Sequence, residues 1–494
     1  MNHLILAAIT MLHAVPGANR PCTVVPCPAD LSAVELLLTE ADTREWITVT
    51  EEGRSAGDRP LYAAHLDRGG DAEKWRVLLV GQQHGDEHAG KDALLHLIAR
   101  LARDADALPQ DVDLWVVPMA NPDGAEADRR RNDAGADLNR DHLLLGQPET
   151  RMLHALARRI RPHVVVDCHE FDRTSAAYRE LGWDEWPLIM MDTANHPLLP
   201  TEVYEAGLAW VDAVTAPMAE AGFEYQRYLV GGPPPWFELR PSTLDGDDAR
   251  NGLALAAGSL GFIIESGFRR AAEDPQADIG RRVAAYLKLL ESLIFDMDLR
   301  ATGLAAVAAV GATNPPSFLP VNTFWGATRT PGGRIHVVDR ETGQPLEVPA
   351  PNLMTDRIFK RAVPTPSGYV VDSLVAGPYL ELLERHVMPF EVLDDPRVMT
   401  VQRCVLDRVE ADFDPVHARY GGRQVVDCES AAERTFAAGS LVVPLEGPSW
   451  RTVAALLEPN QLYGLYQYGE FRDTVADDGT IPVWRIAPPK EEIF

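Results

Sequence analysis

Short apolar runs alternate with helical patterns over roughly the first 300 residues, and this alternation narrows the choice of fold class more than any other feature of the sequence. Four runs have the length and apolar content of buried strands. Between them, apolar residues recur at helical spacing, so that one stripe of each segment would face a core. The strand-like runs lie at 77–80, 114–117, 164–166 and 262–264, and the helical patterns at 93–102, 149–160, 202–221 and 279–299. The alternation predicts an α/β domain with a mixed, largely parallel sheet flanked by helices.

A second domain is expected because the pattern changes near residue 300, in a chain of 494 residues that exceeds one typical domain. Residues 301–320 are rich in Ala, Gly and Pro, which is typical of a connection between domains. Beyond them, strand-like runs predominate, at 334–338, 369–371 and 439–444, with one helical piece at 379–386. We therefore predict an N-terminal segment at 1–28, the α/β domain at 29–300 and a smaller β-rich α+β domain at 301–494.

Charge and hydropathy argue against two classes of partner. The chain has 46 Lys and Arg against 73 Asp and Glu, a formal net charge of −27. Such a field repels phosphate backbones, so nucleic-acid binding is not expected. The sequence contains no run of about 18 consecutive apolar residues, so no integral membrane segment is expected. The oligomeric state cannot be predicted from these features.

The N-terminus and the five cysteines bear on the compartment. Residues 4–12 form a short apolar run that could be a secretory signal, although no Lys or Arg precedes it. Cys22 could pair with Cys27, and Cys404 with Cys428, in an exported chain, while a set of free thiols fits the sequence as well. Export to the periplasm or the cell exterior is slightly favoured over the cytoplasm.

Each of the four strand-like runs ends in polar residues. His84 and Glu87 follow the first run, an Arg- and Asn-rich segment at 130–140 follows the second, and His169 and Glu265 follow the third and fourth. Open α/β sheets place their sites at the carboxyl ends of the strands, where these side chains would meet. Two histidines and a glutamate supply the three protein ligands of a catalytic zinc, which keeps its fourth position for water. The pattern therefore predicts a zinc site.

Each residue also has an ordinary structural interpretation. A single histidine is more often structural than metal-binding, so the combination carries the prediction. Arg130 lies within three consecutive arginines that could form a solvated face, and a shift of one residue would give its role to Arg131. Asp137 could be a turn or cap residue. Glu265 follows three apolar residues, where an unpaired carboxylate is costly, and this favours a functional role.

The motifs resemble those of a known enzyme family. His84-x-x-Glu87, the run Arg-x-Asn-x-x-Gly-x-Asp-Leu-Asn-Arg at 130–140, His169 and Glu265 are similar in order and spacing to the M14 zinc carboxypeptidases, also called funnelins. The resemblance covers roughly residues 60–300, and its middle run is the most specific part. The Asp-Cys-His-Glu form and the long C-terminal extension resemble bacterial branches of the family. The resemblance implies a carboxypeptidase-like fold and makes 29–300 the catalytic domain.

The resemblance implies a hydrolase with one zinc ion per chain, held by His84, Glu87 and His169. Asp137 matches the carboxylate that hydrogen-bonds the other ring nitrogen of the first histidine and fixes its tautomer. Glu265 matches the general base that deprotonates the zinc-bound water and passes the proton to the leaving amine. The implied reaction is hydrolysis of a C-terminal peptide bond.

Substrate-binding residues follow from the same resemblance. Arg130 matches the arginine that polarises the scissile carbonyl, and Asn139 and Arg140 match the pair that binds the substrate's α-carboxylate. In the family, the residue about fifteen positions before the catalytic glutamate lines the pocket for the departing side chain. Here that position holds Arg250, which would favour an acidic C-terminal residue.

Two assignments stay open within the resemblance. Arg250 could instead pair structurally with Asp247 or Asp248. The family usually has a tyrosine that closes over the substrate, for which Tyr225 and Tyr228 are candidates without a matching spacing.

Other functions also stay open. His84-x-x-Glu87-His88 fits an inverted zinc-protease motif, but Gly85 interrupts the helix that this motif requires. A zinc-dependent N-acyl amino acid deacylase, similar to succinylglutamate desuccinylase and aspartoacylase, would share the zinc ligands and cut a small acyl amide. A catalytically inactive homologue would bind peptides, although the complete set of site residues argues against it. The main prediction is a metallocarboxypeptidase acting on peptides.

Overall fold

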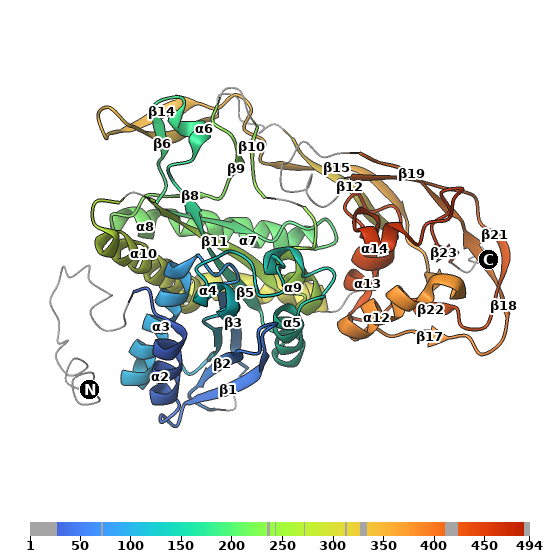
Figure 1. Cartoon of the computed structure of the whole chain (residues 1–494), viewed down its shortest axis with the longest axis horizontal. Coiled ribbons are helices and arrows are strands. Elements are labelled where there is room, and N and C mark those ends of the chain that lie inside the picture. Colours follow the sequence, from blue (N-terminus) through green and yellow to red (C-terminus); the bar gives the residue numbers. More distant parts are fainter. Residues whose placement is uncertain are drawn as a thin grey trace.

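The computed structural model describes residues 27–70, 73–234, 238–242, 244–270, 272–311, 314–326, 333–410 and 423–488. An α/β unit forms the N-terminal part, and a β-rich region lies beside it along the long axis of the molecule (Figure 1). Cys22 and most of the predicted N-terminal segment lie outside the described residues.

An eight-stranded sheet forms the centre of the N-terminal unit. Its strands run in the order β1 (Ile47–Arg54), β2 (Pro60–Asp67), β4 (Val112–Val117), β3 (Trp75–Gly81), β5 (Val164–Asp172), β11 (Leu260–Phe268), β7 (Ile189–Thr193) and β8 (Tyr225–Arg227). The central pairs β4–β3, β3–β5 and β5–β11 are parallel, as is β7–β8 at one edge. The remaining neighbours are antiparallel.

The four predicted strands are the four central ones, β4, β3, β5 and β11, which lie side by side. Each is buried along most of its length, because helices cover both faces of the sheet. The parallel pairing brings their carboxyl ends to one edge, so the polar residues after each run are neighbours. The predicted fold class, a mixed and largely parallel sheet flanked by helices, is confirmed.

Helices pack on both faces of this sheet. One face carries α2 (Leu31–Ala41), α3 (His88–Arg103), α7 (Thr201–Ala213), α8 (Thr215–Glu220) and α10 (Pro275–Phe295). The other face carries α5 (Pro148–Ile160) and α9 (Ala249–Ala257). The single helix expected at 202–221 is divided at Val214. Pro217 explains the break, because its ring excludes the helical carbonyl of Ala213 four residues earlier.

Part of the expected connection at 301–320 is a helix. Helix α11 (Met297–Gly311) continues directly from α10 and packs against α7. Alanine has the highest helix propensity, so an Ala-rich segment becomes a helix when it has a surface to pack on. A Cβ at Gly303 would lie 2.8 Å from the Trp75 ring and 2.9 Å from the Trp210 ring, so the glycine permits the close approach. Residues 301–311 of the expected connection are therefore a packed helix, which composition alone does not distinguish from an irregular connection.

The region after Gly311 is rich in antiparallel strands. Its largest sheet has the order β17 (Glu391–Val392), β22 (Leu441–Pro444), β16 (Gly368–Val371), β23 (Val483–Ile486), β18 (Arg397–Gln402) and β21 (Ala432–Phe436). Two-stranded ribbons are formed by β12 (Phe318–Gly326) with β15 (Asp356–Pro364), and by β19 (Cys404–Glu410) with β20 (Arg423–Cys428). The predicted helical piece is α12 (Ala376–His386). Helix α13 (Trp450–Leu457) was not predicted, because it has only eight residues, about two helical turns, which is too short for a helical period to stand out. The short helix α14 (Gly469–Arg472) follows it.

A small sheet joins the two parts of the chain. Strand β6 (Trp183–Glu185), from the N-terminal unit, pairs with β13 (Arg334–Asp339), which pairs in turn with β14 (Pro345–Pro349). The ring of Trp186 lies 4.9 Å from that of His336. Short strands β9 (Val230–Gly231) and β10 (Leu239–Arg240), and helix α6 (Ala176–Arg179), adjoin this sheet in Figure 1. Residues beyond the predicted boundary at 300 therefore pack on the α/β unit.

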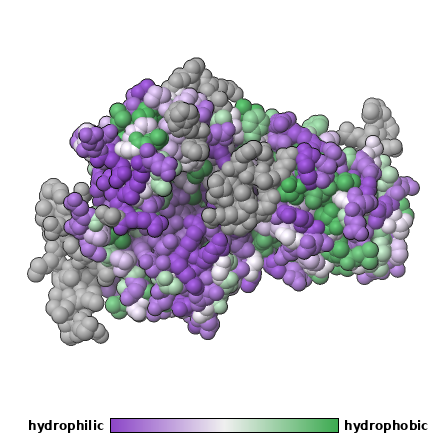
Figure 2. All heavy atoms as spheres, turned by 45° about the horizontal axis from the view of Figure 1, so that its top comes forward, coloured by the Kyte–Doolittle hydropathy of each residue, from purple (hydrophilic) through white to green (hydrophobic). Residues whose placement is uncertain are grey.

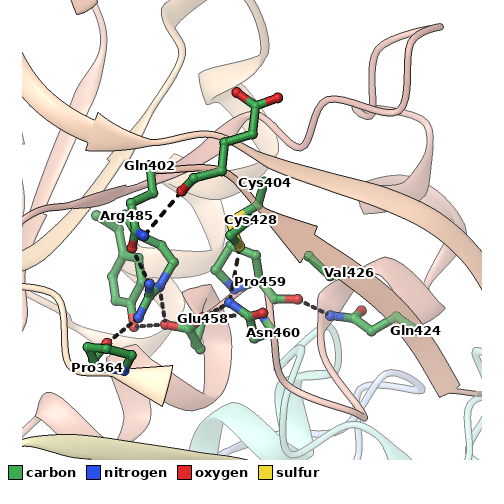
Figure 3. Close-up of a disulfide and its surroundings, with 12 residues drawn as sticks. Pro364, Gln402, Cys404, Gln424, Val426, Cys428, Glu458, Pro459, Asn460 and Arg485 are labelled. Carbon is green, nitrogen blue, oxygen red and sulfur yellow. Dashed lines mark hydrogen bonds and ion pairs between the residues drawn. A yellow bond between two sulfur atoms is a disulfide. The ribbon is translucent and has the colours of Figure 1, made fainter. Parts of the chain in front are cut away.

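A disulfide bond links Cys404, at the start of β19, to Cys428, at the end of β20 (Figure 3). The amide of Asn460 lies 3.2 Å from the sulfur of Cys428. Nearby, the buried Glu458 carboxylate accepts hydrogen bonds from Tyr369 and Arg485 at 3.0 Å each. The expected pairing of these two cysteines is therefore present.

Hydropathy distinguishes parts of the molecule, both in the helices and at the surface. None of the helices in the described part of the chain combines the length and the hydropathy that a bilayer-spanning helix needs. Hydrophilic side chains cover most of the N-terminal unit in the view of Figure 2, and hydrophobic ones are more frequent over the β-rich region.

Candidate metal centre

The loop after β3 carries His84 and Glu87 to the carboxyl edge of the sheet. Glu87 is the last residue before helix α3. A Cβ at Gly85 would lie 1.9 Å from the carbonyl carbon of Gly124, so only glycine fits where this loop crosses the start of α4 (Pro122–Glu126). Gln82 has a left-handed backbone (φ 53°), and its amide donates to the carbonyl oxygen of Gly85 at 2.9 Å. The loop is thus held in one shape by its contacts with the next strand end.

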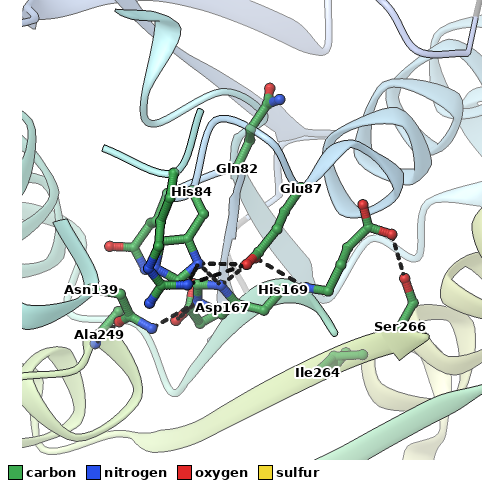
Figure 4. Close-up of polar contacts among 12 residues, drawn as sticks. Gln82, His84, Glu87, Asn139, Asp167, His169, Ala249, Ile264 and Ser266 are labelled. Atoms are coloured by element: carbon green, nitrogen blue, oxygen red, sulfur yellow. Dashed lines mark hydrogen bonds and ion pairs between the residues drawn. The ribbon is translucent and has the colours of Figure 1, made fainter. Parts of the chain in front are cut away.

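Three buried side chains converge at this edge. Nδ1 of His84 lies 2.7 Å from Oε1 of Glu87, and Nδ1 of His169, which comes from β5, lies 2.8 Å from Oε2 (Figure 4). The two Nδ1 atoms are 3.1 Å apart. Among the described residues, this is the one group of three or more His, Cys, Asp or Glu side chains arranged to hold a metal ion, with one ligand atom of each within 4.8 Å of the others. The structure brings the three predicted ligands together.

A carboxylate holds the other ring nitrogen of each histidine. Oδ1 of Asp137 lies 3.2 Å from Nε2 of His84, and Oδ2 of Asp167 lies 2.7 Å from Nε2 of His169. Burial alone would raise the pKa of Asp137, but its hydrogen bond to His84 and the charge of Arg130 hold it well below the usual range. With both outer nitrogens engaged, the inner Nδ1 atoms are left to face the cluster.

Glu265 lies on β11 beside the cluster. In the parallel pairing of β11 with β5 it stands opposite His169. Burial raises the pKa of Glu265 to about 7; the charges of the two histidines oppose this shift and that of Glu87 adds to it. The hydroxyl of Tyr228 donates a hydrogen bond to the Glu265 carboxylate. A carboxyl group that titrates near neutral pH can both accept and release a proton.

Arg130 and Asn139 lie at the rim of the cluster. Nε of Arg130 donates to Oδ2 of Asp137 at 2.9 Å, and its Nη1 lies 3.2 Å from Nδ1 of His84. The Arg130 side chain is 43% exposed. The amide nitrogen of Asn139 lies 2.9 Å from Nε2 of His169, and its oxygen accepts from the backbone N–H of Ala249 at 2.8 Å. Both residues are therefore within reach of a group bound at the cluster.

Arg140 and Arg250 are surrounded by aspartates. Burial would lower the pKa of Arg140, but the nearby charges of Asp247, Asp137, Asp245 and Asp248 raise it. Arg250 is fully buried. Its Nη2 donates to Oδ2 of Asp248 at 3.0 Å, and its Nη1 lies 3.5 Å from Oδ2 of Asp192 on β7.

Three residues at the site were not assigned from the sequence. Asp167 precedes His169 by two positions, so the period of two in a strand places both side chains on one face and could have revealed the contact. Gln83 donates to Asp167 at 2.7 Å, a contact between the loop after β3 and strand β5 that no local pattern marks. Tyr228 was one of two candidate tyrosines. The other, Tyr225, donates to the carbonyl oxygen of Val211 at 2.7 Å and belongs to the core.

The donor set fits zinc. Two imidazole nitrogens and one carboxylate are a common set of protein ligands in catalytic zinc sites. The cluster is buried, and carboxylates hold both histidines in the orientation that leaves Nδ1 facing inwards. His88 does not take part: its Nε2 lies 3.0 Å from Oδ1 of Asp128 and its Nδ1 lies 3.1 Å from the amide of Gln82. The arrangement therefore disagrees with the inverted zinc-protease motif.

Comparison with known proteins agrees with this geometry. The sequence model of the zinc carboxypeptidase family, peptidase M14, matches residues 36–154, which include His84, Glu87 and the run at 130–140. This part of the chain belongs to the M14 zinc carboxypeptidase family. The matched segment ends before His169 and Glu265, which the fold brings to the same edge of the sheet.

Two proteins similar in sequence and one similar in structure are named carboxypeptidases. Carboxypeptidase 2 of Trichophyton equinum is 35% identical over 201 residues, which are 35% of this chain and 37% of that protein. Carboxypeptidase D of Mus musculus is 30% identical over 195 residues, 29% of this chain and 14% of that protein. A metallo-carboxypeptidase from Pseudomonas aeruginosa in complex with (2-guanidinoethylmercapto)succinic acid covers 55% of this chain and 70% of its own, with 22% identity and a TM-score of 0.42. The chain thus spans little more than a third of the length of the Trichophyton relative.

Proposed function

We propose that this protein is a zinc-dependent metallocarboxypeptidase that removes the C-terminal residue of peptides. The observation that carries the proposal is the register of β11 with β5, which sets the Glu265 carboxylate beside the His84, Glu87 and His169 cluster. A proton acceptor next to three convergent ligands is an arrangement suited to metal-dependent hydrolysis of an amide bond. The M14 family match supports the same reaction class.

In this proposal, each residue around the cluster has a separate role in the reaction. A bound zinc ion would supply a Lewis acid that polarises the scissile carbonyl and makes water a better nucleophile near neutral pH. The Glu265 carboxylate takes up the proton of the attacking water and returns it to the nitrogen of the leaving amine. The partly exposed guanidinium of Arg130 donates N–H groups to the oxygen on which negative charge develops. Asn139 and Arg140 bind the C-terminal carboxylate of the substrate.

The finer proposal concerns specificity. Arg250 is buried close to Tyr228, which itself contacts Glu265, so a substrate side chain that passes the catalytic carboxylate would approach Arg250. A guanidinium there favours a carboxylate side chain and disfavours a basic one. Asp248 and Asp192 already contact Arg250, and this favours the competing arrangement in which Arg250 only braces the pocket. The ranking of peptides ending in Glu, Leu and Lys distinguishes the two, because only a selecting Arg250 loses the preference for Glu when changed to Ala.

Digestion of a diverse peptide mixture, read by mass spectrometry, tests the reaction. Purified protein loaded with zinc should remove single residues from free C-termini. Glu265→Gln should retain zinc and lose activity by about 10²- to 10⁴-fold, the usual contribution of a positioned base. Glu224→Gln, which alters a partly exposed carboxylate paired with Arg281, is the matched control and should keep full activity.

Two other results would redirect the assignment. Cleavage of N-acyl amino acids in parallel assays, with peptides left intact, would identify a deacylase. Binding of peptides without turnover, in protein that contains zinc, would identify an inactive homologue.

We further propose that the protein is exported. The support is the Cys404–Cys428 disulfide, since disulfides persist mainly in oxidising compartments. Fractionation of the source cells followed by detection of the protein tests this, and recovery only from the cytoplasm would contradict it.

A further inference from the structure

A chain of buried hydrogen bonds leads away from His169 toward the β-rich region. It passes from His169 to Asp167 (2.7 Å), to Gln83 (2.7 Å), to His142 (2.8 Å) and to His154 on helix α5 (3.2 Å). All five side chains are buried. Only the first of them is a zinc ligand in the proposed function. The other four therefore need a separate explanation.

The chemistry of the partners determines where each proton lies. A carboxylate only accepts, so the amide of Gln83 donates to Asp167 and its carbonyl oxygen is left to accept. That oxygen accepts from Nε2–H of His142, so Nδ1 of His142 carries no proton and accepts from Nε2–H of His154. Every donor in the chain thus points toward Asp167. With a metal ion bound at Nδ1, the single proton of His169 lies on Nε2. Asp167, at 2.7 Å, is the acceptor for that proton, because the Asn139 amide nitrogen, at 2.9 Å from Nε2, has only donors.

Two properties support this series of hydrogen bonds: both histidine rings are neutral, and the ring of His142 has little room to move. Burial lowers the pKa of His142 to about 4 and that of His154 well below its usual value, so both rings are neutral at pH 7. A neutral imidazole has one donor and one acceptor, as each position in the chain requires. His142 is also confined from the side, since a Cβ at Gly252 would lie 2.6 Å from the Cβ of His142.

The far end of the chain lies against the β-rich region. The ring of His386, the last residue of α12, meets that of His154 edge to face, with centroids 5.7 Å apart. Nε2 of His386 donates to the carbonyl oxygen of Leu143, next to His142, at 2.9 Å. Arg385 donates to the carbonyl oxygen of Leu144 at 3.4 Å. Helix α12 therefore holds both the ring of His154 and the backbone beside His142.

We propose that His142 is a positioning residue for the metal ligand His169, acting through Gln83 and Asp167, and that His386 of the β-rich region holds His142 in place. The proposal rests on the zinc site of the proposed function. According to this proposal, residues beyond 311 affect the metal centre. Displacement of α12 would weaken the series of hydrogen bonds that ends at the metal ligand His169.

Metal binding by variants of the full chain tests the proposal. His142→Leu removes the donor to Gln83, and we expect zinc affinity to fall at least about 10-fold, as for other groups that orient metal ligands. The visible spectrum of the cobalt-substituted protein should change, because it reports ligand geometry, and kcat should fall while KM stays within about 2-fold. His142→Gln keeps an N–H able to reach Gln83 and should recover most of the affinity.

Two further variants locate the effect. His163→Leu alters an equally buried histidine at the other end of β5, where it bonds to Arg76, and should leave the cobalt spectrum unchanged. His386→Leu should shift affinity and spectrum in the same direction as His142→Leu, by a smaller amount. An unchanged metal site in His386→Leu would remove the β-rich region from the proposal.

The results separate this proposal from the proposed function. A parent protein that binds neither zinc nor cobalt overturns the metal centre itself. The positioning role is overturned if the parent binds zinc and cobalt and His142→Leu folds with the same zinc affinity and the same cobalt spectrum as the parent. If His142→Leu does not fold, nitrogen NMR of the zinc-loaded parent decides: a proton on Nε2 of His142 supports the chain, and a proton on Nδ1 overturns it.

Discussion

Asp137 and Asp167 each hold one of the two histidines of the metal centre by its outer ring nitrogen. Asp137 lies 3.2 Å from Nε2 of His84, and Asp167 lies 2.7 Å from Nε2 of His169. Because both contacts are made through Nε2, both histidines turn Nδ1 toward Glu87. The two aspartates come from different parts of the chain and give the two imidazoles the same tautomer.

Removing either negative charge should weaken metal binding. Asp137→Asn and Asp167→Asn are each expected to lower zinc affinity by about 10- to 100-fold, because the amide holds and polarises the imidazole less strongly. Competition with a chromogenic chelator measures the change. Asp113→Asn is the matched control, since Asp113 also bonds a histidine, His65, at 2.8 Å but lies away from the cluster. Equal affinity in all three variants would show that the aspartates have no part in holding the ligands.

Zinc removal should lower the stability of the fold as well as the activity. A ligand that binds only the folded state stabilises it by about 2.7 kcal/mol at 100 times its Kd. We expect one zinc per chain by elemental analysis, a lower unfolding temperature after chelation, and recovery on adding zinc back. His84→Gln should show no zinc-dependent shift. If neither the chelator nor added zinc changes the unfolding temperature of the parent, the result would argue against a bound ion.

Glu185, on strand β6, should make stability depend on pH. Burial raises its pKa to about 7 from the ordinary 4.5, against the hydrogen bond from Ser175 and the charge of Arg173. The folded state then binds more protons than the unfolded state between these two values. The contribution of Glu185 to the free energy of unfolding is therefore fully present below about pH 4.5. It is lost as the pH rises from about 4.5 to about 7, and the loss is at most about 3 kcal/mol.

The matched substitution is Glu185→Gln, which resembles the protonated carboxyl group at every pH. Urea unfolding of parent and variant at pH 5 and pH 8 isolates the effect, because other titrating groups cancel in the difference. The variant should gain stability relative to the parent at pH 8. A difference that does not change with pH would show that Glu185 titrates normally.

The Cys404–Cys428 bond should stabilise the β-rich region. The two cysteines are 24 positions apart, and closing a loop of this size contributes about 3 kcal/mol by restricting the unfolded chain. The double variant with alanine at both positions should unfold earlier in calorimetry, in the transition that belongs to this region. Zinc affinity, measured on the folded double variant, should stay close to that of the parent. Equal unfolding profiles for variant and parent would contradict this role.

Much of the fold follows from local sequence pattern. The runs at 77–80, 114–117, 164–166 and 262–264 are the four central strands, because buried strands need short, continuous apolar segments. Helix α13 and the helical part of 301–320 were missed for different reasons. Helix α13 has only eight residues, about two turns, so its period does not stand out, whereas α11 is made largely of small apolar residues and has no polar face to reveal its period.

The metal-ligand candidates follow from local features of the amino-acid sequence. His84 and Glu87 are three positions apart on one loop, and the polar residues that follow each buried run had to meet at the carboxyl edge of a parallel sheet. This information is local, because it depends only on strand ends and short spacings. It was enough to choose the three metal-ligand candidates, and the family resemblance added Glu265 as the candidate base.

The surroundings of these residues depend on long-range packing, which local sequence does not encode. Gln83 meets Asp167 across 84 positions and His142 across 59, and His386 meets Leu143 across 243. Such contacts depend on how whole elements pack, which no spacing within one element encodes. The same holds for Arg250, whose partners Asp248 and Asp192 come from a helix cap and from a neighbouring strand. Burial then turns these contacts into shifted pKa values and fixed tautomers, since removal from water is what makes each charge and proton position matter.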